Sequence, residues 1–125
     1  MPGRKTKLTR RLLSQVQGLI RAYRWVPPVC GHLGISKKTF HMWYNRGKEE
    51  SARLERPRTK PRRKEALYLE FYETVTQGRH LAEADAIQNI RDSEAWQSDA
   101  WFLERTFPER WSVERKKETL AETLH

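Results

Sequence analysis

The stretch from residue 26 to residue 45, VPPVCGHLGISKKTFHMWYN, constrains the fold more than any other part of the chain. Its two prolines are tolerated in the first turn of a helix, so a helix is expected to begin near them. Gly34 lies where the chain must leave that helix in a left-handed conformation, which a Cβ atom disfavours. Ser36 can then cap a second helix through its hydroxyl group. The stretch predicts two short helices joined by a tight turn, a helix-turn-helix.

The apolar residues of this stretch support the prediction. Val29 and Leu33 lie four residues apart on the first helix, and Phe40 and Trp43 lie three apart on the second. With Ile35 in the turn they can close a small core. The rest of the second helix, residues 37–48 with Gly47 weakening its end, is polar and basic, as a helix in the DNA major groove requires. The alternative is a helical hairpin whose basic face is only solvated. The expected DNA contacts are Ser36, Lys37, Lys38, His41, Met42, Asn45 and Arg46.

A third helix is expected before this pair, over residues 10–23, with Thr9 as its N-cap. It should cover the core of the pair, which gives a three-helix DNA-binding domain over residues 1–50. The basic residues 1–7 are expected to form a flexible arm that touches DNA phosphates or enters a minor groove, or a disordered start. Apolar residues recur along the third helix at helical spacing: Leu12, Val16, Leu19 and Ile20.

Charge is distributed unevenly along the chain. Residues 1–64 hold 18 Lys and Arg against 3 Asp and Glu, whereas residues 65–125 hold 7 against 13. The strongly basic half indicates a polyanionic partner, which beside a helix-turn-helix is expected to be double-stranded DNA rather than an anionic membrane. Residues 51–64 are expected to form an extended basic linker along the DNA backbone, or a solvated hinge that only tethers two parts. The expected phosphate contacts of this linker are Arg58, Lys60, Arg62 and Arg63.

The acidic half, residues 65–125, is expected to be a helical oligomerisation region. Its longest helical pattern covers residues 65–91, and a long amphipathic helix without a large partner in its own chain indicates self-association. Packing within the monomer is the alternative, and both can hold at once. The expected contacts between copies are Leu67, Phe71, Val75, Ala82, Ala86, Ile90 and Trp101.

A shorter helix is expected after the long one, over residues 94–106, and Pro108 stops it. Phe107 and Trp111 bracket this proline and are expected to fold back onto the preceding helices. The polar residues 112–125 are expected to form a frayed helix or a tail that docks to a partner.

The sequence lacks the patterns that enzymatic chemistry requires. No G-x-x-x-x-G-K-[ST] loop is present for an ATPase, and the scattered carboxylates favour a solvated face over a metal-dependent nuclease. The single Cys30 cannot form an internal disulfide and is expected to pack in the core. We therefore expect no enzymatic activity, no cofactor and no metal. No apolar run is long enough to span a membrane, and no apolar secretory segment begins the chain, so a soluble protein of a reducing compartment is expected.

Several segments carry a resemblance to a known family. They are GRKTKLT near the N-terminus, GISKKTFHMW followed by RGKEE, the long helix, and AWFLERTFPERW. In these segments the chain resembles the small subunits of bacteriophage terminases. The resemblance implies that the helix-turn-helix binds the packaging site of the viral genome and that copies assemble as a ring through the central helices. It also implies delivery of DNA to the terminase large subunit, which holds the ATPase and nuclease, in the cytoplasm of the bacterial host.

Two other functions stay open at this point. A helix-turn-helix transcriptional regulator or a transposition accessory protein would use the same domain as a dimer, although it would not require the aromatic block AWFLERTFPERW. A pure assembly protein would use its basic half to neutralise DNA without reading the base sequence.

Overall fold

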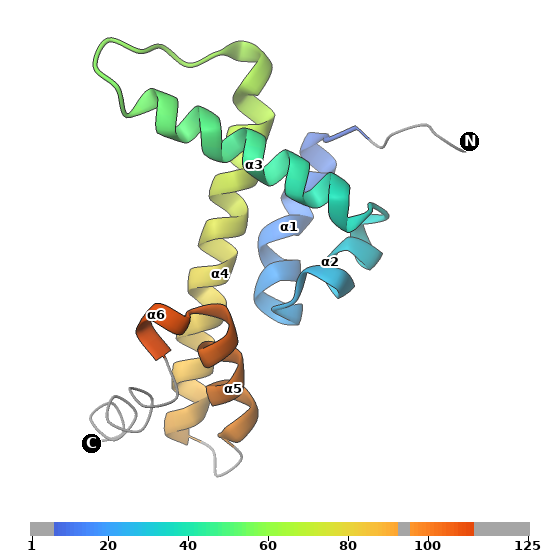
Figure 1. Ribbon diagram of the computed structural model, residues 1–125. Coiled ribbons are helices and arrows are strands. Elements are labelled where there is room, and N and C mark those ends of the chain that lie inside the picture. The colour runs from blue at the N-terminus through green and yellow to red at the C-terminus, as the bar shows by residue number, and fades with distance from the viewer. Residues whose placement is uncertain (1–6, 93–95, 112–125) are drawn as a thin grey trace. The chain divides into compact units, whose positions relative to one another are not determined.

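The computed structural model describes residues 7–92 and 96–111. Within these two ranges all regular structure is helical, which confirms the expected all-α class, and no helix there is both long and apolar enough to cross a lipid bilayer (Figure 1). The expectations for the first six residues of the arm and for the tail, residues 112–125, lie outside the described residues. The elements are α1 (Arg10–Tyr23), α2 (Val26–Leu33), α3 (Lys37–Leu54), the short 3₁₀ helix η1 (Arg63–Glu65), α4 (Ala66–Asp92), α5 (Gln97–Thr106) and α6 (Pro108–Trp111).

The starts of α1 and α3 and the end of α2 lie where local signals in the sequence predict them. The Thr9 hydroxyl accepts a hydrogen bond from the backbone N–H of Leu12 at 3.2 Å and caps α1. Gly34 ends α2 with φ of 71°, in the left-handed conformation. The Ser36 hydroxyl accepts a hydrogen bond from the backbone N–H of Thr39 at 3.1 Å and caps α3. These bonds confirm the predicted caps and the tight turn between α2 and α3.

The chain forms two compact units, residues 1–80 and residues 81–125, and α4 contributes to both. The division falls within α4, and the basic stretch 51–64 lies inside the first unit. Each unit has a hydrophobic core of its own.

The first part of α4 holds the first unit together. Phe71 is fully buried, and its ring meets those of Phe40 and Trp43 edge-on at centroid distances of 5.2 and 5.5 Å. Gly78 lies against α1, where an added Cβ would come within 2.9 Å of the Ile20 Cβ. This contribution of α4 to the first core was not predicted from the sequence. The remaining buried members of this core are Leu8, Leu13, Val16, Val29, Cys30, Leu33 and Val75.

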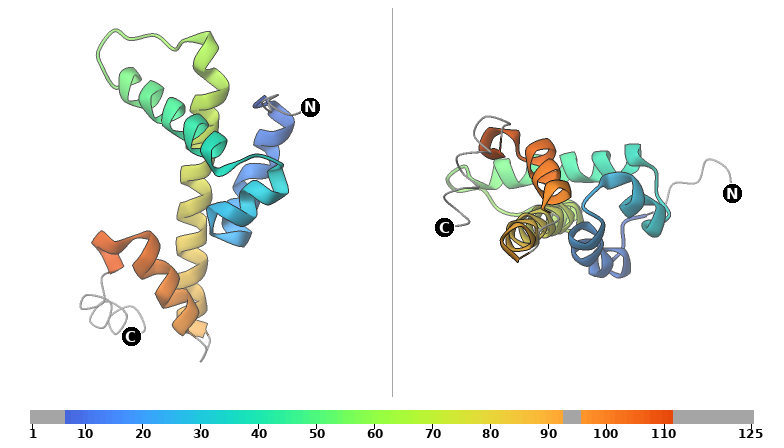
Figure 2. Two further views of the ribbon diagram at one scale, coloured as in Figure 1. Left: turned by 45° about the vertical axis from the view of Figure 1, so that its right-hand side comes forward. Right: turned by 90° about the horizontal axis from the view of Figure 1, so that it is seen from below.

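Helix α3 is longer than the sequence analysis predicted. It ends at Leu54 rather than near residue 48, so residues 51–54 are helical and not part of an extended linker. Figure 1 and the left-hand view of Figure 2 show α3 crossing α4. Gly47 lies inside α3 and is buried against α4. A Cβ at this position would overlap the carbonyl oxygen of Tyr68 and lie 2.6 Å from the Cβ of Tyr72. The missing side chain is therefore what lets the two helices approach.

The second unit packs the last part of α4 against α5 and α6. The Glu83 carboxylate accepts hydrogen bonds from the guanidinium of Arg110 at 2.8 Å and from the indole N–H of Trp111 at 2.9 Å. Phe107 is 8% exposed and Trp111 is 7% exposed, so the expected return of these rings onto the preceding helices is confirmed. The core of the unit consists of Ala82, Ala86, Ile90, Ala100, Phe102, Leu103, Phe107 and Trp111.

Most residues that were expected to join copies of the chain are instead buried within it. Leu67 is partly buried against the first core, whereas Trp101 is 50% exposed. The other five lie in the two cores of the monomer: Phe71, Val75, Ala82, Ala86 and Ile90. Packing within the monomer is therefore their role in this structure. Association of copies stays a prediction, and of this set Trp101 is the most exposed.

Candidate nucleic-acid interface

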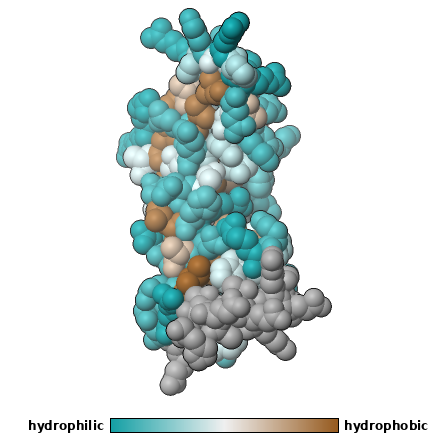
Figure 3. Space-filling view, turned by 90° about the vertical axis from the view of Figure 1, so that its left-hand side faces the viewer, coloured by the Kyte–Doolittle hydropathy of each residue, from teal (hydrophilic) through white to brown (hydrophobic). Residues whose placement is uncertain are grey.

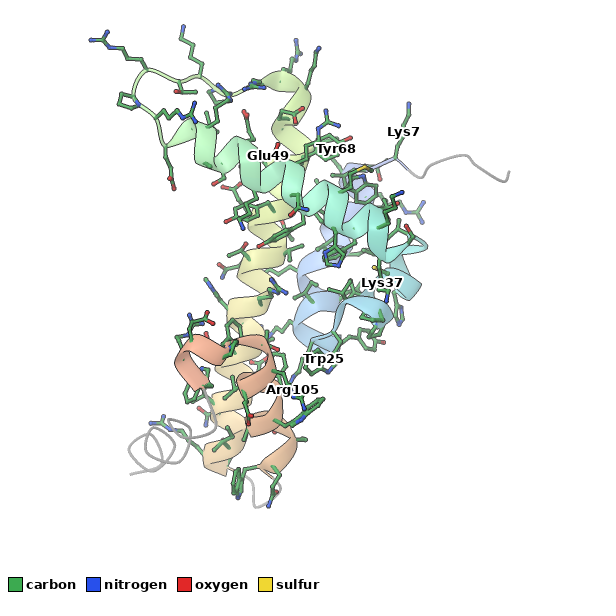
Figure 4. All side chains as sticks on the ribbon, in the orientation of Figure 1. Lys7, Trp25, Lys37, Glu49, Tyr68 and Arg105 are labelled. Carbon is green, nitrogen blue, oxygen red and sulfur yellow. The ribbon has the colours of Figure 1, made fainter. Side chains whose placement is uncertain are left out.

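The outward face of α3 covers the first turns of the helix and consists of Ser36, Lys37, Lys38, His41, Met42 and Asn45. All six residues are exposed, and Met42 keeps 44% of its surface accessible. Lys37, which Figure 4 labels near the start of this face, makes no hydrogen bond or ion pair with another described residue, and neither do Lys38 and Asn45. The face thus offers two ammonium groups, an amide, an imidazole and a thioether to a partner outside the chain.

The inner face of the same helix fixes the outward face in place. Phe40 is 2% exposed and Trp43 is 3% exposed, so α3 is anchored in the core one turn after another. The Cys30 thiol lies against the cap and donates a hydrogen bond to the carbonyl oxygen of Ser36 at 3.8 Å. Burial raises the pKa of this thiol, and the nearby ammonium of Lys37 acts in the opposite direction. Cys30 is buried and free, which confirms its predicted place in the core.

Arg46 differs from the other expected contacts because a partner within the unit already holds it. Its guanidinium donates two hydrogen bonds of 2.7 Å to the Glu65 carboxylate and lies 4.1 Å from the ring centroid of Tyr68. The hydrogen bond to Glu65 raises the pKa of Arg46, and the same bond lowers the pKa of Glu65. A DNA contact by this guanidinium would have to share or replace the ion pair. The pair itself holds η1 on α3.

A shallow pocket of about 360 Å³ lies beside the outward face. Apolar side chains and rings form most of its lining, and two cations, Lys7 and Arg46, contribute to it. Figure 4 labels Lys7 and Tyr68, which come from the segment before α1 and from α4. The other lining residues are Leu8, Thr39, Met42 and Trp43.

Glu50, which was not predicted as a site residue, holds the basic stretch against α3 by hydrogen bonds. Glu50 is 4% exposed, and its carboxylate accepts hydrogen bonds from Nε and a terminal nitrogen of Arg53 at 2.7 and 2.8 Å. It accepts a third from the backbone N–H of Arg62 at 2.9 Å. Arg53 also donates to the carbonyl oxygen of Lys60 at 2.7 Å. The hydrogen bonds from Arg53, with that from Arg62, lower the pKa of Glu50 to about 2 against the opposing effect of burial.

A signal for Glu50 was present in the sequence. Phe40, Trp43, Gly47 and Glu50 follow one another at steps of three and four residues, which is the spacing of one helix face. The first three are buried, so the fourth is expected on the same side. An acidic residue on a buried face has to find cationic or N–H partners, because an isolated buried charge is costly.

The expected phosphate contacts of the basic stretch fall into two groups. Arg58, Lys60 and Arg63 are exposed, and their side chains have no carboxylate partner among the described residues. The guanidinium of Arg62 lies 3.7 Å from the Glu50 carboxylate, although the side chain is 60% exposed. Arg58, Lys60 and Arg62 thus lie on a loop, residues 55–62, and Arg63 lies at the start of η1. Arg62 alone of these four cations has a carboxylate nearby among the described residues.

In the part of the chain that the structure describes, no three His, Cys, Asp or Glu residues lie close enough together to hold a metal ion. Of the four histidines, His32, His41 and His80 lie in this described part, and His125 lies outside it. Comparison with protein-family models, with curated proteins and with solved structures finds no match to this chain.

Proposed function

We propose that this chain binds double-stranded DNA through the outward face of α3 and acts as the small subunit of a viral DNA-packaging terminase. In this role it recognises the packaging site, assembles with further copies of itself, and delivers the DNA to a large subunit that carries the ATPase and nuclease. The proposal combines the geometry of α3 with the sequence resemblance described above. It includes a three-helix helix-turn-helix arrangement of α1, α2 and α3.

The observation that carries the DNA-binding part is the contrast between paired and unpaired cations in the first unit. Arg10 is paired with Glu70 at 2.9 Å, Arg46 with Glu65, and Arg53 with Glu50. The lysines at the start of α3 have no such partner. Carboxylates thus neutralise these three arginines within the first unit, while the outward face keeps its positive charge for a polyanion.

The side chains of this face match the chemistry of base edges and phosphates. Asn45 can form two hydrogen bonds with an adenine, and Met42 can contact the methyl group of a thymine. Lys37 and Lys38 can reach a guanine edge or a phosphate oxygen. A face with both kinds of group can position the protein on the duplex and read part of its sequence.

Selection from a random duplex library tests the reading of bases. The preferred duplex and a scrambled duplex are titrated with the wild-type protein and with the Asn45→Ala variant. We expect the variant to lose discrimination between the two, because one good bidentate pair is worth about 1–3 kcal/mol against the wrong base. An equal loss of affinity on both duplexes would contradict the assignment of Asn45.

The packaging role is tested by solution mass from light scattering, with and without a terminase large subunit. A closed assembly of well over four chains that binds the large subunit would support it. A dimer that ignores the large subunit would contradict it and favour a regulator.

A further inference from the structure

The bonds around Glu50 convert the basic stretch from a linker into a closed loop. Glu50 and Arg53, both on α3, together hold the backbone of Lys60 and of Arg62. The loop, residues 55–62, is therefore fastened to the same helix that it leaves. Its exposed cations, with those of the following 3₁₀ helix, are Arg56, Arg58, Lys60, Arg62, Arg63 and Lys64, and Glu55 is the one acidic residue of the loop.

The side chains of this loop are turned outward. Arg58 takes a positive φ of 62°, which is uncommon for a residue with a Cβ and marks the tip of a tight bend. Hydrophilic side chains prevail at the top of Figure 3, where the loop faces the viewer. The loop thus presents a cationic surface.

The loop, residues 55–62, and the outward face lie at different ends of α3. A helix rises about 1.5 Å per residue, so the nine residues from Asn45, the last residue of that face, to Leu54, the end of α3, span about 14 Å. The major groove is about 12 Å wide. If the first turns of α3 lie in the groove, the loop at the far end lies outside it, where the DNA presents phosphates and no base edges.

We propose that Glu50 and Arg53 are positioning residues that hold the loop, residues 55–62, as a second contact for the phosphates of the same DNA duplex. This inference rests on the proposed function and adds to it a contact that is independent of base sequence. The fastened loop requires little ordering on binding, whereas a free linker would lose conformational freedom at that step.

The salt dependence of duplex binding tests the contact. Each phosphate contact contributes about 0.9 to the slope of log K against log salt. We expect the triple variant R58Q/K60Q/R63Q to lower this slope by about 2 to 3 while the preference for the selected duplex is kept. Glu50→Gln retains every loop cation, and we expect it to lower the slope by about 1 or more. Arg105→Gln, which removes one exposed cation of the second unit, is the matched control and should leave the slope unchanged.

Trypsin digestion tests the fastening without any DNA. Arg56 and Lys60 each precede a proline and resist trypsin, so the bond after Arg58 reports on the loop. We expect this bond to be cut slowly in the wild-type protein, at least about tenfold faster in Glu50→Gln, and more slowly when duplex is added. Arg53→Lys keeps the charge but not the two-pronged bond, and it replaces Glu50→Gln if circular dichroism shows that the latter is unfolded.

The outcomes separate the two proposals. An unchanged slope in the triple variant, with duplex binding retained, would overturn the loop contact and leave the role of α3 intact. A lower slope in the triple variant but not in Glu50→Gln or Arg53→Lys would overturn the positioning role. Rapid cleavage after Arg58 in the wild-type protein would overturn the fastened loop. Absence of duplex binding by the wild-type protein would overturn the proposed function, and the DNA contact of the loop with it.

Discussion

At the scale of single residues, Glu50 shows how a buried charge is kept in a small helical unit. Burial disfavours the carboxylate, while the hydrogen bonds from Arg53 and from the backbone of Arg62 favour it, and the bonds prevail. The pKa in the folded chain therefore lies near 2, below the ordinary value of 4.5. Such a group stabilises the fold above pH 4.5, and this contribution is lost as the pH falls toward 2.

This linkage predicts how Glu50→Gln behaves with pH. The free energy of unfolding of the variant should lie below that of the wild-type protein at pH 6, and the difference should shrink as the pH falls from 4.5 toward 2. Denaturant unfolding at a series of pH values measures it. Glu65 also has a lowered pKa, chiefly from its bond to Arg46, while the charge of Glu50 acts in the opposite direction. The comparison therefore cancels most, but not all, of the contribution of Glu65. A difference that stays constant down to pH 2.5 would contradict the account of Glu50.

Gly47 provides a second prediction at this scale. Gly47→Ala places a methyl group into the crossing with α4, and overpacking of this kind costs about 1–3 kcal/mol or more of unfolding free energy. Gly18→Ala is the matched control, because it lies in a helix with nothing within 4 Å of the added Cβ. The control should stabilise the fold by roughly 0.5–1 kcal/mol, as expected for glycine to alanine in a helix. Thermal unfolding of both variants gives the comparison, and the same sign for both would contradict it.

Cys30 provides a third prediction. Since burial raises its pKa, little of the thiol is in the reactive thiolate form at neutral pH. A chromogenic thiol reagent should therefore react with Cys30 at least about tenfold more slowly in the folded protein than in denaturant. Equal rates in the two conditions would show that Cys30 is accessible.

At the scale of elements, the sequence predicted what depends on neighbours in the chain. The start of α1 at Arg10, the left-handed Gly34 and the cap at Ser36 all follow from residues within one turn of the feature. The end of α3 does not, because Gly47 weakens an isolated helix but here lies against Tyr68. The spacing within α3 places Gly47 on the buried face but does not show that α4 packs there, and this tertiary contact overrides the local propensity.

The cap of α3 can be tested by itself. Ser36→Ala removes the acceptor for the Thr39 N–H and should lower the free energy of unfolding by about 1 kcal/mol. Ser14→Ala is the control, since Ser14 lies inside α1 and donates to the Arg11 carbonyl, a bond that adds little to helix stability. Its effect should stay within about 0.5 kcal/mol. Chemical denaturation measures both, and a larger loss in the control would contradict the capping role.

At the scale of the whole molecule, helical spacing showed which residues are buried but not what buries them. The apolar face of α4 reads as one stripe, yet Phe71 and Val75 belong to the core of one unit and Ala82, Ala86 and Ile90 to the core of the other. A periodic pattern cannot distinguish packing inside the chain from packing between copies. The candidate DNA face was read correctly as exposed, whereas the pairing of Arg46 and the role of Glu50 depend on residues that folding brings together.

The most direct test of the central claim is a map of backbone amide chemical shifts as duplex DNA is added to the ¹⁵N-labelled protein. We expect the largest changes at Ser36, Lys37, Lys38, His41 and Asn45, a second group at residues 55–64, and small changes in α5. Changes concentrated in α5 and α6, with the start of α3 unaffected, would contradict it.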